Sequence, residues 1–172
     1  MGAGKFTVIN SLELDNDGVV LEIGSERGEG STQYIYDFCK QNDLVFFTID
    51  FEDDAFSRAK NICGECAYQK KGEDFLNSFE WKQMDKNITF AYLDNFAWMW
   101  NPNITDDSYT SQISLYSSYD LEMNNGNSQL AHLDQAKLVD TFSSETCYIL
   151  FDDTFVNSNG DFDGKGGLAI SY

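Results

Sequence analysis

A glycine-rich loop follows the first strongly apolar run of the chain. The run Val19–Ile23 contains one acidic residue, Glu22, and glycines at positions 24, 28 and 30 come next, before a helical pattern begins at Ser31. Glycine adopts positive φ and lets a ligand approach the backbone closely, and the first turn of a helix offers unpaired N–H groups. Strand, glycine loop and helix in this order predict a binding site for a nucleotide-like cofactor.

The spacing of the three glycines bears on which cofactor would bind. A dinucleotide site has the pattern G-x-G-x-x-G, whereas Gly24, Gly28 and Gly30 form G-x-x-x-G-x-G. A carboxylate at Glu22 would repel a pyrophosphate and attract an ammonium group. These features favour S-adenosylmethionine, which carries an ammonium and a sulfonium group and no phosphate. A nicotinamide cofactor is the alternative, because Asp50, at the end of the second apolar run, would serve the ribose of either.

Three aspartates form a second group of residues that could carry out chemistry. Asp94 follows the apolar run Ile88–Leu93, and Asp152 and Asp153 follow the run Cys147–Phe151. In a doubly wound sheet these two strands are neighbours, so we expect the three carboxylates to converge at one edge of the cleft. Close carboxylates repel one another, and Mg²⁺ or another hard divalent cation would compensate. The alternative is that Asp152 and Asp153 are ordinary acids facing solvent.

Three smaller features could also carry chemistry. His132 is the only histidine, and a neutral imidazole beside the cleft could accept a proton, although a helix-surface position is the alternative. Cys63 and Cys66 have C-x-x-C spacing, but no second pair accompanies them, so reduced thiols are the simpler interpretation. The segment Gly164–Gly167 lacks the Ser or Thr of a phosphate loop and is interpreted as a turn into a final helix.

The elements that must position these residues follow from five apolar runs. Near-continuous apolar runs are typical of parallel strands that are covered on both faces. The predicted strands are Val19–Ile23, Leu44–Ile49, Ala67–Lys70, Ile88–Leu93 and Cys147–Phe151.

Helical patterns lie between these strands. Ser31 is expected to cap a helix that runs to about Lys40, a second helix starts at Asp53 or Asp54, and a third includes the segment 75–79. Ser128 is expected to cap a fourth, whose inward residues are Leu130, Leu133, Ala136, Leu138, Val139 and Phe142. This alternation predicts an α/β fold of three layers, α/β/α, with a Rossmann-like, doubly wound, mostly parallel sheet in the strand order 3-2-1-4-5.

The chain is long enough for one domain, which we place at residues 1–172, with residues 1–17 as a lead-in. Residues 101–127 interrupt the pattern with a stretch rich in Ser, Asn, Tyr and Asp, after the carboxyl end of a strand. We expect a substrate lid there, against the alternative of an inert surface excursion. Aromatic residues crowd the same region and could wall a substrate pocket or pack as core: Phe96, Trp98, Trp100 and Tyr109.

The overall charge narrows the classes of partner. The formal net charge is −18, which disfavours nucleic acid as a partner, although solubility alone could account for it. No run of about 18 apolar residues is present, so no membrane span is expected. The first ten residues lack the apolar core of a signal peptide, and we expect a cytoplasmic protein.

The segment from Glu22 to Thr32 resembles the first motif of class I S-adenosylmethionine-dependent methyltransferases. The resemblance is to the small-molecule O-methyltransferases of the macrocin and catechol type. It implies that Asp50 binds the ribose hydroxyls and that Glu73 lies beside the adenine. The cofactor-binding residues it implies are Glu22, Gly24, Ser25, Gly28, Gly30, Ser31, Asp50, Phe51, Glu73 and Asp94.

The same resemblance implies methyl transfer to a hydroxyl of a small molecule, such as a sugar or a polyketide. Asp94, Asp152 and Asp153 would hold a metal ion, and Asp94 and His132 are the candidate catalytic residues. Catechol-type enzymes have a lysine base one turn beyond the fourth-strand acid, where this chain has Ala97. A module that binds the cofactor without turnover is an alternative.

The family's sheet ends in an antiparallel pair of strands, for which the residues after Phe151 offer no apparent sequence. We therefore expect either a missing C-terminal part or a homo-oligomer in which a partner covers the open sheet edge.

Overall fold

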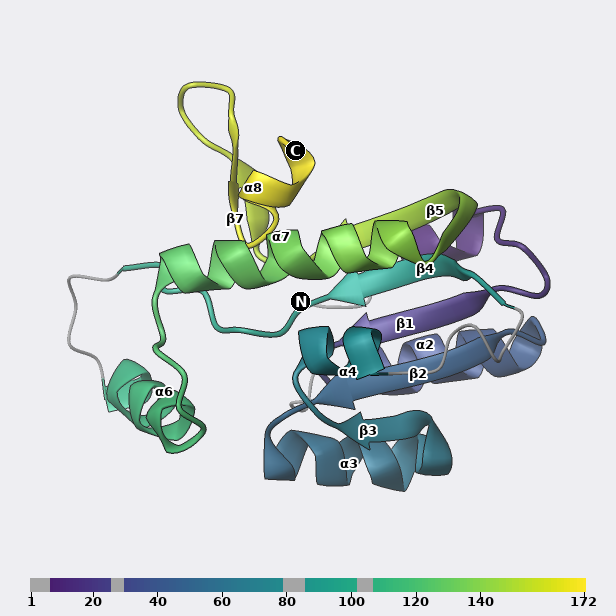
Figure 1. Ribbon diagram of the computed structural model, residues 1–172, viewed down its shortest axis with the longest axis horizontal. Helices are drawn as coiled ribbons and strands as arrows, with labels where there is room; N and C mark the ends of the chain where they lie inside the picture. Colours follow the sequence, from purple (N-terminus) through teal and green to yellow (C-terminus); the bar gives the residue numbers. More distant parts are fainter. Residues whose placement is uncertain (1–6, 26–29, 79–85, 102–106) are drawn as a thin grey trace.

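The protein is built around a five-stranded parallel sheet in the order β3-β2-β1-β4-β5 (Figure 1). The computed structural model describes residues 7–25, 30–78, 86–101 and 107–172. The strand order confirms the predicted 3-2-1-4-5 topology. The strands are β1 (Val19–Ile23), β2 (Val45–Asp50), β3 (Ala67–Gln69), β4 (Ile88–Leu93) and β5 (Ser143–Phe151).

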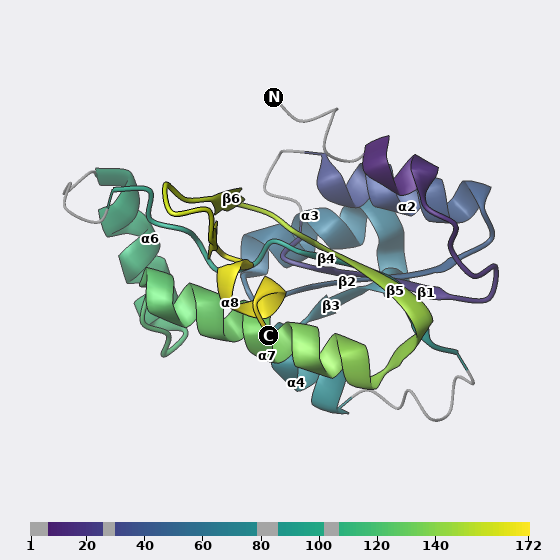
Figure 2. The same cartoon turned by 90° about the horizontal axis from the view of Figure 1, so that it is seen from above.

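Helices cover both faces of the sheet and give the three predicted layers (Figure 2). One face carries the 3₁₀ helix η1 (Thr7–Ser11), α2 (Ser31–Gln41) and α3 (Asp53–Cys63), with the 3₁₀ turn η2 (Gly64–Cys66) leading into β3. The other face carries α4 (Gly72–Ser78) and α7 (Asn125–Thr141). The fold is therefore the Rossmann-like α/β sandwich that the sequence predicts.

Two apolar cores explain why the central strands are apolar along their whole length. Every residue of β1 and β4 is buried. Leu21 and Ile23 point into the core with α4 and α7, whereas Val20 points into the core with α2 and α3. Both faces of these strands are thus removed from water, which is the condition that continuous apolar runs satisfy. Glu22 and Thr48, paired across β1 and β2, are polar exceptions on the α2 face.

The start and the buried face of α7 differ from the sequence-based prediction. Asn124 is the N-cap, and its side chain accepts a hydrogen bond from the backbone N–H of Asn127 at 2.7 Å. Leu130, expected inward, is 52 % exposed. The fully buried positions of the helix are Ser128, His132, Gln135 and Val139. Val139 is buried as predicted, and Leu138 and Phe142 pack against the core. Ser128, His132 and Gln135 were missed because they are polar and their side chains make hydrogen bonds inside the fold.

The N-terminus of α2 also differs in detail. Gly30, and not Ser31, is the N-cap residue, with φ of +87° and no side-chain cap. A left-handed conformation of this kind is open to glycine at little cost, so the last glycine of the motif is used to enter the helix.

Residues 101–127 are more regular than expected. Among its described residues, helix α6 (Asp107–Ser118) is a continuous helix, and it lies beyond the arrowheads of the strands in Figure 1. Its buried Tyr116 packs in a small core with Phe51, Phe96 and Met123. The insertion is therefore attached to the carboxyl edge of the sheet, as a substrate lid would need to be.

The segment after β5 forms a short antiparallel hairpin that the sequence analysis missed. Strands β6 (Thr154–Val156) and β7 (Phe162–Gly164) pair only with each other, so they form a second sheet and leave β5 at the edge of the first. A turn then leads into α8 (Gly167–Ile170), as predicted, and α8 packs against α7. Among the described residues, no helix has the length and apolar character needed to cross a bilayer.

Candidate functional site

The carboxyl ends of β1, β2, β4 and β5 lie at one edge of the sheet (Figure 1). Most of the predicted site residues are at or just after these strand ends. Ligands of open α/β sheets bind at such an edge, where neighbouring crossovers diverge to opposite faces. In this sheet the divergence lies between β1 and β4, because β2 and β4 flank β1 on opposite sides.

A chain of hydrogen bonds links the acidic ends of β1 and β2. The Thr48 hydroxyl donates to Oε2 of Glu22 at 2.6 Å, so its oxygen can only accept from the Ser25 hydroxyl, which lies 2.9 Å away. The backbone N–H of Ser25 donates to Oδ2 of Asp50 at 2.7 Å. Glu22 and Asp50 therefore lie in the same corner, as a shared cofactor site requires.

Asp50 is buried, and its carboxylate accepts a hydrogen bond from the backbone of the loop that follows β2. Its Oδ1 accepts from the backbone N–H of Glu52 at 2.9 Å, in addition to the bond from Ser25. Both carboxylate oxygens of Asp50 thus accept a backbone N–H, and a carboxylate oxygen can accept more than one hydrogen bond, as contact with a sugar diol would require. Since Asp50 is only 3 % exposed, the diol would have to enter from the loop side of the strand.

Glu22 is fully buried and incompletely hydrogen-bonded. Thr32 of α2 adds a second hydroxyl donor to Oε2, at 2.7 Å, and Oε1 has no partner within the described residues. Burial raises the pKa of Glu22 to about 7, against the opposing effect of the hydroxyl donors. A buried acceptor without a donor is costly unless a ligand supplies the donor.

The first glycine of the motif is needed for packing. Gly24 has a φ of +98°, and a Cβ at this position would lie 2.3 Å from the backbone nitrogen of Asn95. The bend after β1 is thereby pressed against the end of β4. No described atom lies within 4 Å of the position of a Cβ at Gly30, and Ser25 and Ser31 are both buried. Gly28 lies outside the described residues.

A cavity of about 190 Å³ opens between the ends of β2 and β4. This is smaller than the 300–1,000 Å³ of a typical small-molecule site, so it suits one ring system of a larger ligand, roughly a base. The cavity lies at the predicted positions Phe51 and Glu73. Its lining residues are Phe51, Lys71, Glu73, Asn95, Phe96, Leu121 and Ala131.

The polar groups of this cavity could recognise a base edge. Gln135 of α7 donates its Nε2–H to Oε1 of Glu73 at 2.7 Å, and burial raises the pKa of Glu73. Oδ1 of Asn95 and Oε1 of Gln135 are buried and have no donor among the described residues. Phe51 and Phe96 line the same cavity as Glu73 and Asn95, and we call this cavity the aromatic slot.

Helix α6 and the turn after it pack against Phe51, one of the residues that line this slot. Phe51 makes edge-to-face contacts with Tyr116 and Tyr119, with ring centroids 5.5 and 5.1 Å apart. The Tyr116 hydroxyl accepts from the backbone N–H of Ala97 at 2.7 Å in a buried position. The insertion is thus fixed to the loops after both β2 and β4.

The three predicted aspartates do converge. Asp94, Asp152 and Asp153 each place one carboxylate oxygen within 4.8 Å of the others. A lysine lies among them: Nζ of Lys165 is 2.6 Å from Oδ1 of Asp94 and 3.1 Å from Oδ2 of Asp153. The sequence analysis interpreted the segment around Lys165 as a turn and missed this contact.

Burial and charge act together in this acidic cluster. Burial raises the pKa of Asp94 to about 6, although the Lys165 ammonium opposes the shift. Burial lowers the pKa of Lys165, but Asp94 and Asp153 outweigh it and keep the pKa above its ordinary value. The Tyr92 hydroxyl donates to Oδ2 of Asp94 at 3.0 Å. The lysine is therefore a charged member of the cluster.

His132 is placed behind the site. Its ring is fully buried, and Nδ1 lies 2.7 Å from the carbonyl oxygen of Ser128, so Nδ1 carries the proton. Nε2 has no partner among the described residues. Burial lowers the pKa of His132 to about 4, which makes the ring neutral at pH 7. A catalytic role stays a prediction, and it requires an opening that this conformation does not have.

Aromatic side chains gather beside the acidic cluster. Phe155 of β6 follows Asp153 by two residues and stacks on Trp100, with ring centroids 5.5 Å apart. Trp98 meets Phe155 edge-on, at 6.4 Å. Trp100 is 62 % exposed, so its ring offers a platform to a ligand, whereas Tyr109 packs against the small core under α6.

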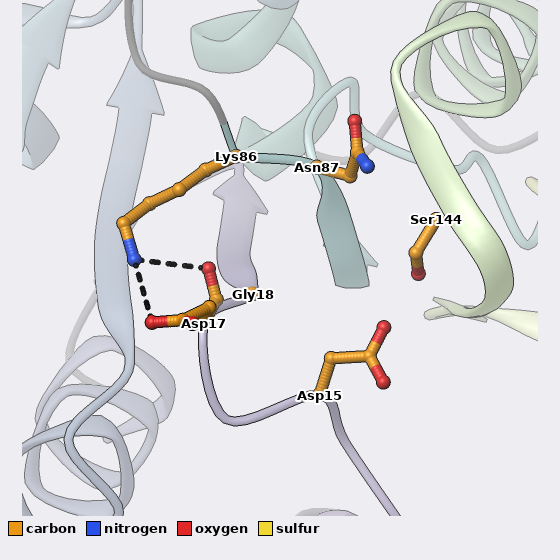
Figure 3. Close-up of a pocket in the computed structure, with 6 residues that line it drawn as sticks. All are labelled: Asp15, Asp17, Gly18, Lys86, Asn87 and Ser144. Atoms are coloured by element: carbon orange, nitrogen blue, oxygen red, sulfur yellow. Dashed lines mark hydrogen bonds and ion pairs between the residues drawn. The ribbon is translucent and has the colours of Figure 1, made fainter.

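A second cavity, of about 130 Å³, lies at the opposite edge of the sheet, at the amino ends of β1, β4 and β5 (Figure 3). Lys86 donates to the backbone carbonyl of Asp17 at 3.0 Å and pairs with its carboxylate at 3.4 Å. Asp15 and Ser144 also line it. None of the sequence-predicted site residues borders this cavity, so the carboxyl edge remains the candidate site.

Comparison with known proteins gives no relative: no protein-family model matches the chain, no curated protein matches it, and no solved structure matches it. Function must therefore be argued from the site.

Proposed function

We propose that the chain binds S-adenosylmethionine at the carboxyl ends of β1, β2 and β4 and transfers its methyl group to a hydroxyl of a small molecule. The observation that carries the proposal is the cavity lined by Phe51, Phe96 and Asn95, next to the Glu22–Asp50 corner, together with two buried acceptors that have no donor among the described residues, Oε1 of Glu22 and Oδ1 of Asn95. Such acceptors fit a ligand that brings hydrogen-bond donors.

The aromatic slot would hold the adenine. Phe51 and Phe96 would contact its faces, and the exocyclic amine would donate to Glu73 or to Oδ1 of Asn95, two residues that line the slot. Asp50 would accept from the ribose hydroxyls. Glu22 would pair through Oε1 with the ammonium group of the methionine part, because a cation there compensates the cost of a buried carboxylate.

The chemistry needs alignment more than activation. The donor methyl carbon is bonded to a sulfonium, so the acceptor oxygen attacks it in line, the new C–O bond forms as the C–S bond breaks, and the hydroxyl proton leaves to a nearby base. Asp94 and Asp152 lie at the end of the neighbouring strands and can take this proton. Trp98, Trp100 and Phe155 would contact the body of the acceptor.

Two alternatives differ in what would bind and react. A nicotinamide oxidoreductase would use Asp50 in the same way, but it would bring a pyrophosphate against Glu22, whose neighbours Thr32 and Thr48 are hydroxyls and not cations. A non-catalytic module would bind the methyl donor and leave every acceptor unchanged. A small-molecule acceptor, with no nucleic acid, agrees with the net charge of −18, and the proposal includes a cytoplasmic location.

Isothermal titration calorimetry with S-adenosylhomocysteine and with NAD separates the cofactors. We expect micromolar binding of S-adenosylhomocysteine, roughly −8 kcal/mol, and no heat with NAD. Asp50→Asn should weaken that binding by about tenfold or more, whereas the exposed Asp54→Asn serves as the matched control and should not change it. Binding of NAD and not of S-adenosylhomocysteine would overturn the proposal. Mass spectrometry of a panel of hydroxyl compounds then tests methyl transfer.

A further inference from the structure

The acidic cluster is already occupied by a cation that belongs to the chain. Lys165 is 3 % exposed, and its ammonium contacts Oδ1 of Asp94 at 2.6 Å, Oδ2 of Asp153 at 3.1 Å and the carbonyl oxygen of Asp94 at 3.3 Å. We propose that Lys165 is the resident cation of this cluster and takes the place that a divalent metal ion would need.

The donor count of the ammonium supports this role. A lysine has three N–H donors, and the three oxygens named above can take all of them. A metal ion such as Mg²⁺ would have to bind the same carboxylate oxygens, at about 2.1 Å, and would then lie against a buried ammonium group. Two cations at such a separation repel strongly where water is excluded. The carboxylates are thus spaced for a metal ion, but with Lys165 in place they do not fit one.

The fold positions the lysine as firmly as it positions the aspartates. The hairpin register pairs Thr154 with Gly164, so Lys165 falls beside Asp153, and its backbone N–H donates to the carbonyl of Asp153 at 3.1 Å. A Cβ at Gly164 would lie 2.0 Å from that same carbonyl oxygen, so only glycine permits this approach. The backbone N–H of Gly166 is bonded to the Thr154 hydroxyl at 2.9 Å on the other side. Lys165 is therefore a fixed part of the site.

One consequence rests on the proposed function. A metal ion in an O-methyltransferase binds the acceptor hydroxyl at an open coordination position, whereas an ammonium whose donors are all used has none to offer. Lys165 is then a positioning residue, which holds Asp94 and Asp153 at the acceptor side, and methyl transfer proceeds without a divalent cation. EDTA should leave the rate unchanged.

Electron paramagnetic resonance titration with Mn²⁺ tests the assignment directly. Wild type and Lys165→Arg should show no site tighter than about 1 mM. Lys165→Gln removes the charge and leaves three carboxylates together, so it should gain one Mn²⁺ site, at least about 100-fold tighter than any in wild type. Adding Asp153→Asn to Lys165→Gln should abolish that site. Circular dichroism confirms that each variant is folded.

Two results would overturn the inference. One is a Mn²⁺ site in wild type that Asp153→Asn removes, and this result needs no lysine variant to fold. The other is a folded Lys165→Gln variant that gains no Mn²⁺ site. S-adenosylhomocysteine calorimetry reports separately on the proposed function, because cofactor binding does not involve the ammonium. If the wild-type protein bound neither S-adenosylhomocysteine nor Mn²⁺, the proposed function would be contradicted, but the assignment of Lys165 as the resident cation would not.

Discussion

At the scale of single residues, the buried carboxylate of Glu22 is contacted by hydroxyl groups and not by a positively charged side chain. Thr32 and Thr48 donate hydrogen bonds to Oε2, and burial raises the pKa to about 7. The motif around Glu22 and the acid at Asp50 could be predicted from the sequence, because their spacing to the glycine loop is local. Thr48 could not be assigned a role, since its contact with Glu22 depends on the register between β1 and β2.

The pKa of Glu22 makes cofactor affinity depend on pH. The free chain holds Glu22 mostly protonated below pH 7, whereas an ammonium ligand pairs with the ionised form, so binding must release a proton. Affinity for S-adenosylhomocysteine should therefore be constant above about pH 8 and fall by about tenfold for each pH unit below 7. Calorimetry in two buffers of different ionisation enthalpy measures the proton release.

Glu22→Gln provides the control for this pH dependence. The amide keeps the shape and accepts from both threonines, but it does not titrate. Its binding should be weaker at pH 8 and independent of pH between 5.5 and 8.5. A wild-type affinity that stays flat across that range would rule out the pairing of Glu22 with the ammonium.

At the scale of elements, apolar runs predicted the strands well, whereas buried faces made of polar residues could not be recognised in the sequence. The five strands were found because each is buried on at least one side by apolar residues. The buried face of α7 was predicted only in part, because Val139 lies there as expected but Ser128, His132 and Gln135 are polar. The hairpin β6–β7 was missed because its three-residue strands are largely exposed. The hairpin is what carries Lys165 to the site.

The attachment of α6 should depend on one buried hydroxyl. Tyr116→Phe leaves the buried backbone N–H of Ala97 without its acceptor, so it should cost about 1–3 kcal/mol in free energy of unfolding. Tyr119→Phe is the matched control, because its hydroxyl accepts an exposed, longer bond from the N–H of Asp53. That change should stay within about 0.5 kcal/mol. Urea denaturation measures both, and equal effects would contradict the assigned contact.

The close approach at Gly164 gives a second test at this scale. Gly164 and Gly160 have nearly the same φ, +86° and +87°, but only Gly164 is pressed against a backbone carbonyl. Both alanine variants should lose about 1 kcal/mol from the left-handed conformation. Gly164→Ala should lose about 1–3 kcal/mol more, from overlap with Asp153. Thermal unfolding of the two variants measures this difference. A Gly164→Ala variant as stable as Gly160→Ala would contradict the close approach of Gly164 to the Asp153 carbonyl.

At the scale of the whole molecule, the sheet edge unites two sites that the chain encodes far apart. Strand order brings Gly24, Asp50 and the acidic cluster to one edge. This could be predicted because alternating strands and helices indicate a doubly wound sheet, for which the Rossmann-like order 3-2-1-4-5 is one of the two common orders. The cation in the acidic cluster could not be predicted, because Lys165 is positioned by the hairpin β6–β7, which lies outside the alternation of strands and helices. In a chain with a net charge of −18, the ammonium of Lys165 reduces the repulsion among the carboxylates at this edge.

A crystal structure grown with saturating S-adenosylhomocysteine tests the central claim most directly. We predict nucleoside density with the adenine between Phe51 and Phe96, the ribose hydroxyls on Asp50, and the ammonium group at Glu22. Density for the nucleoside at any other place, or an empty slot at saturation with the two rings closed on each other, would contradict the account.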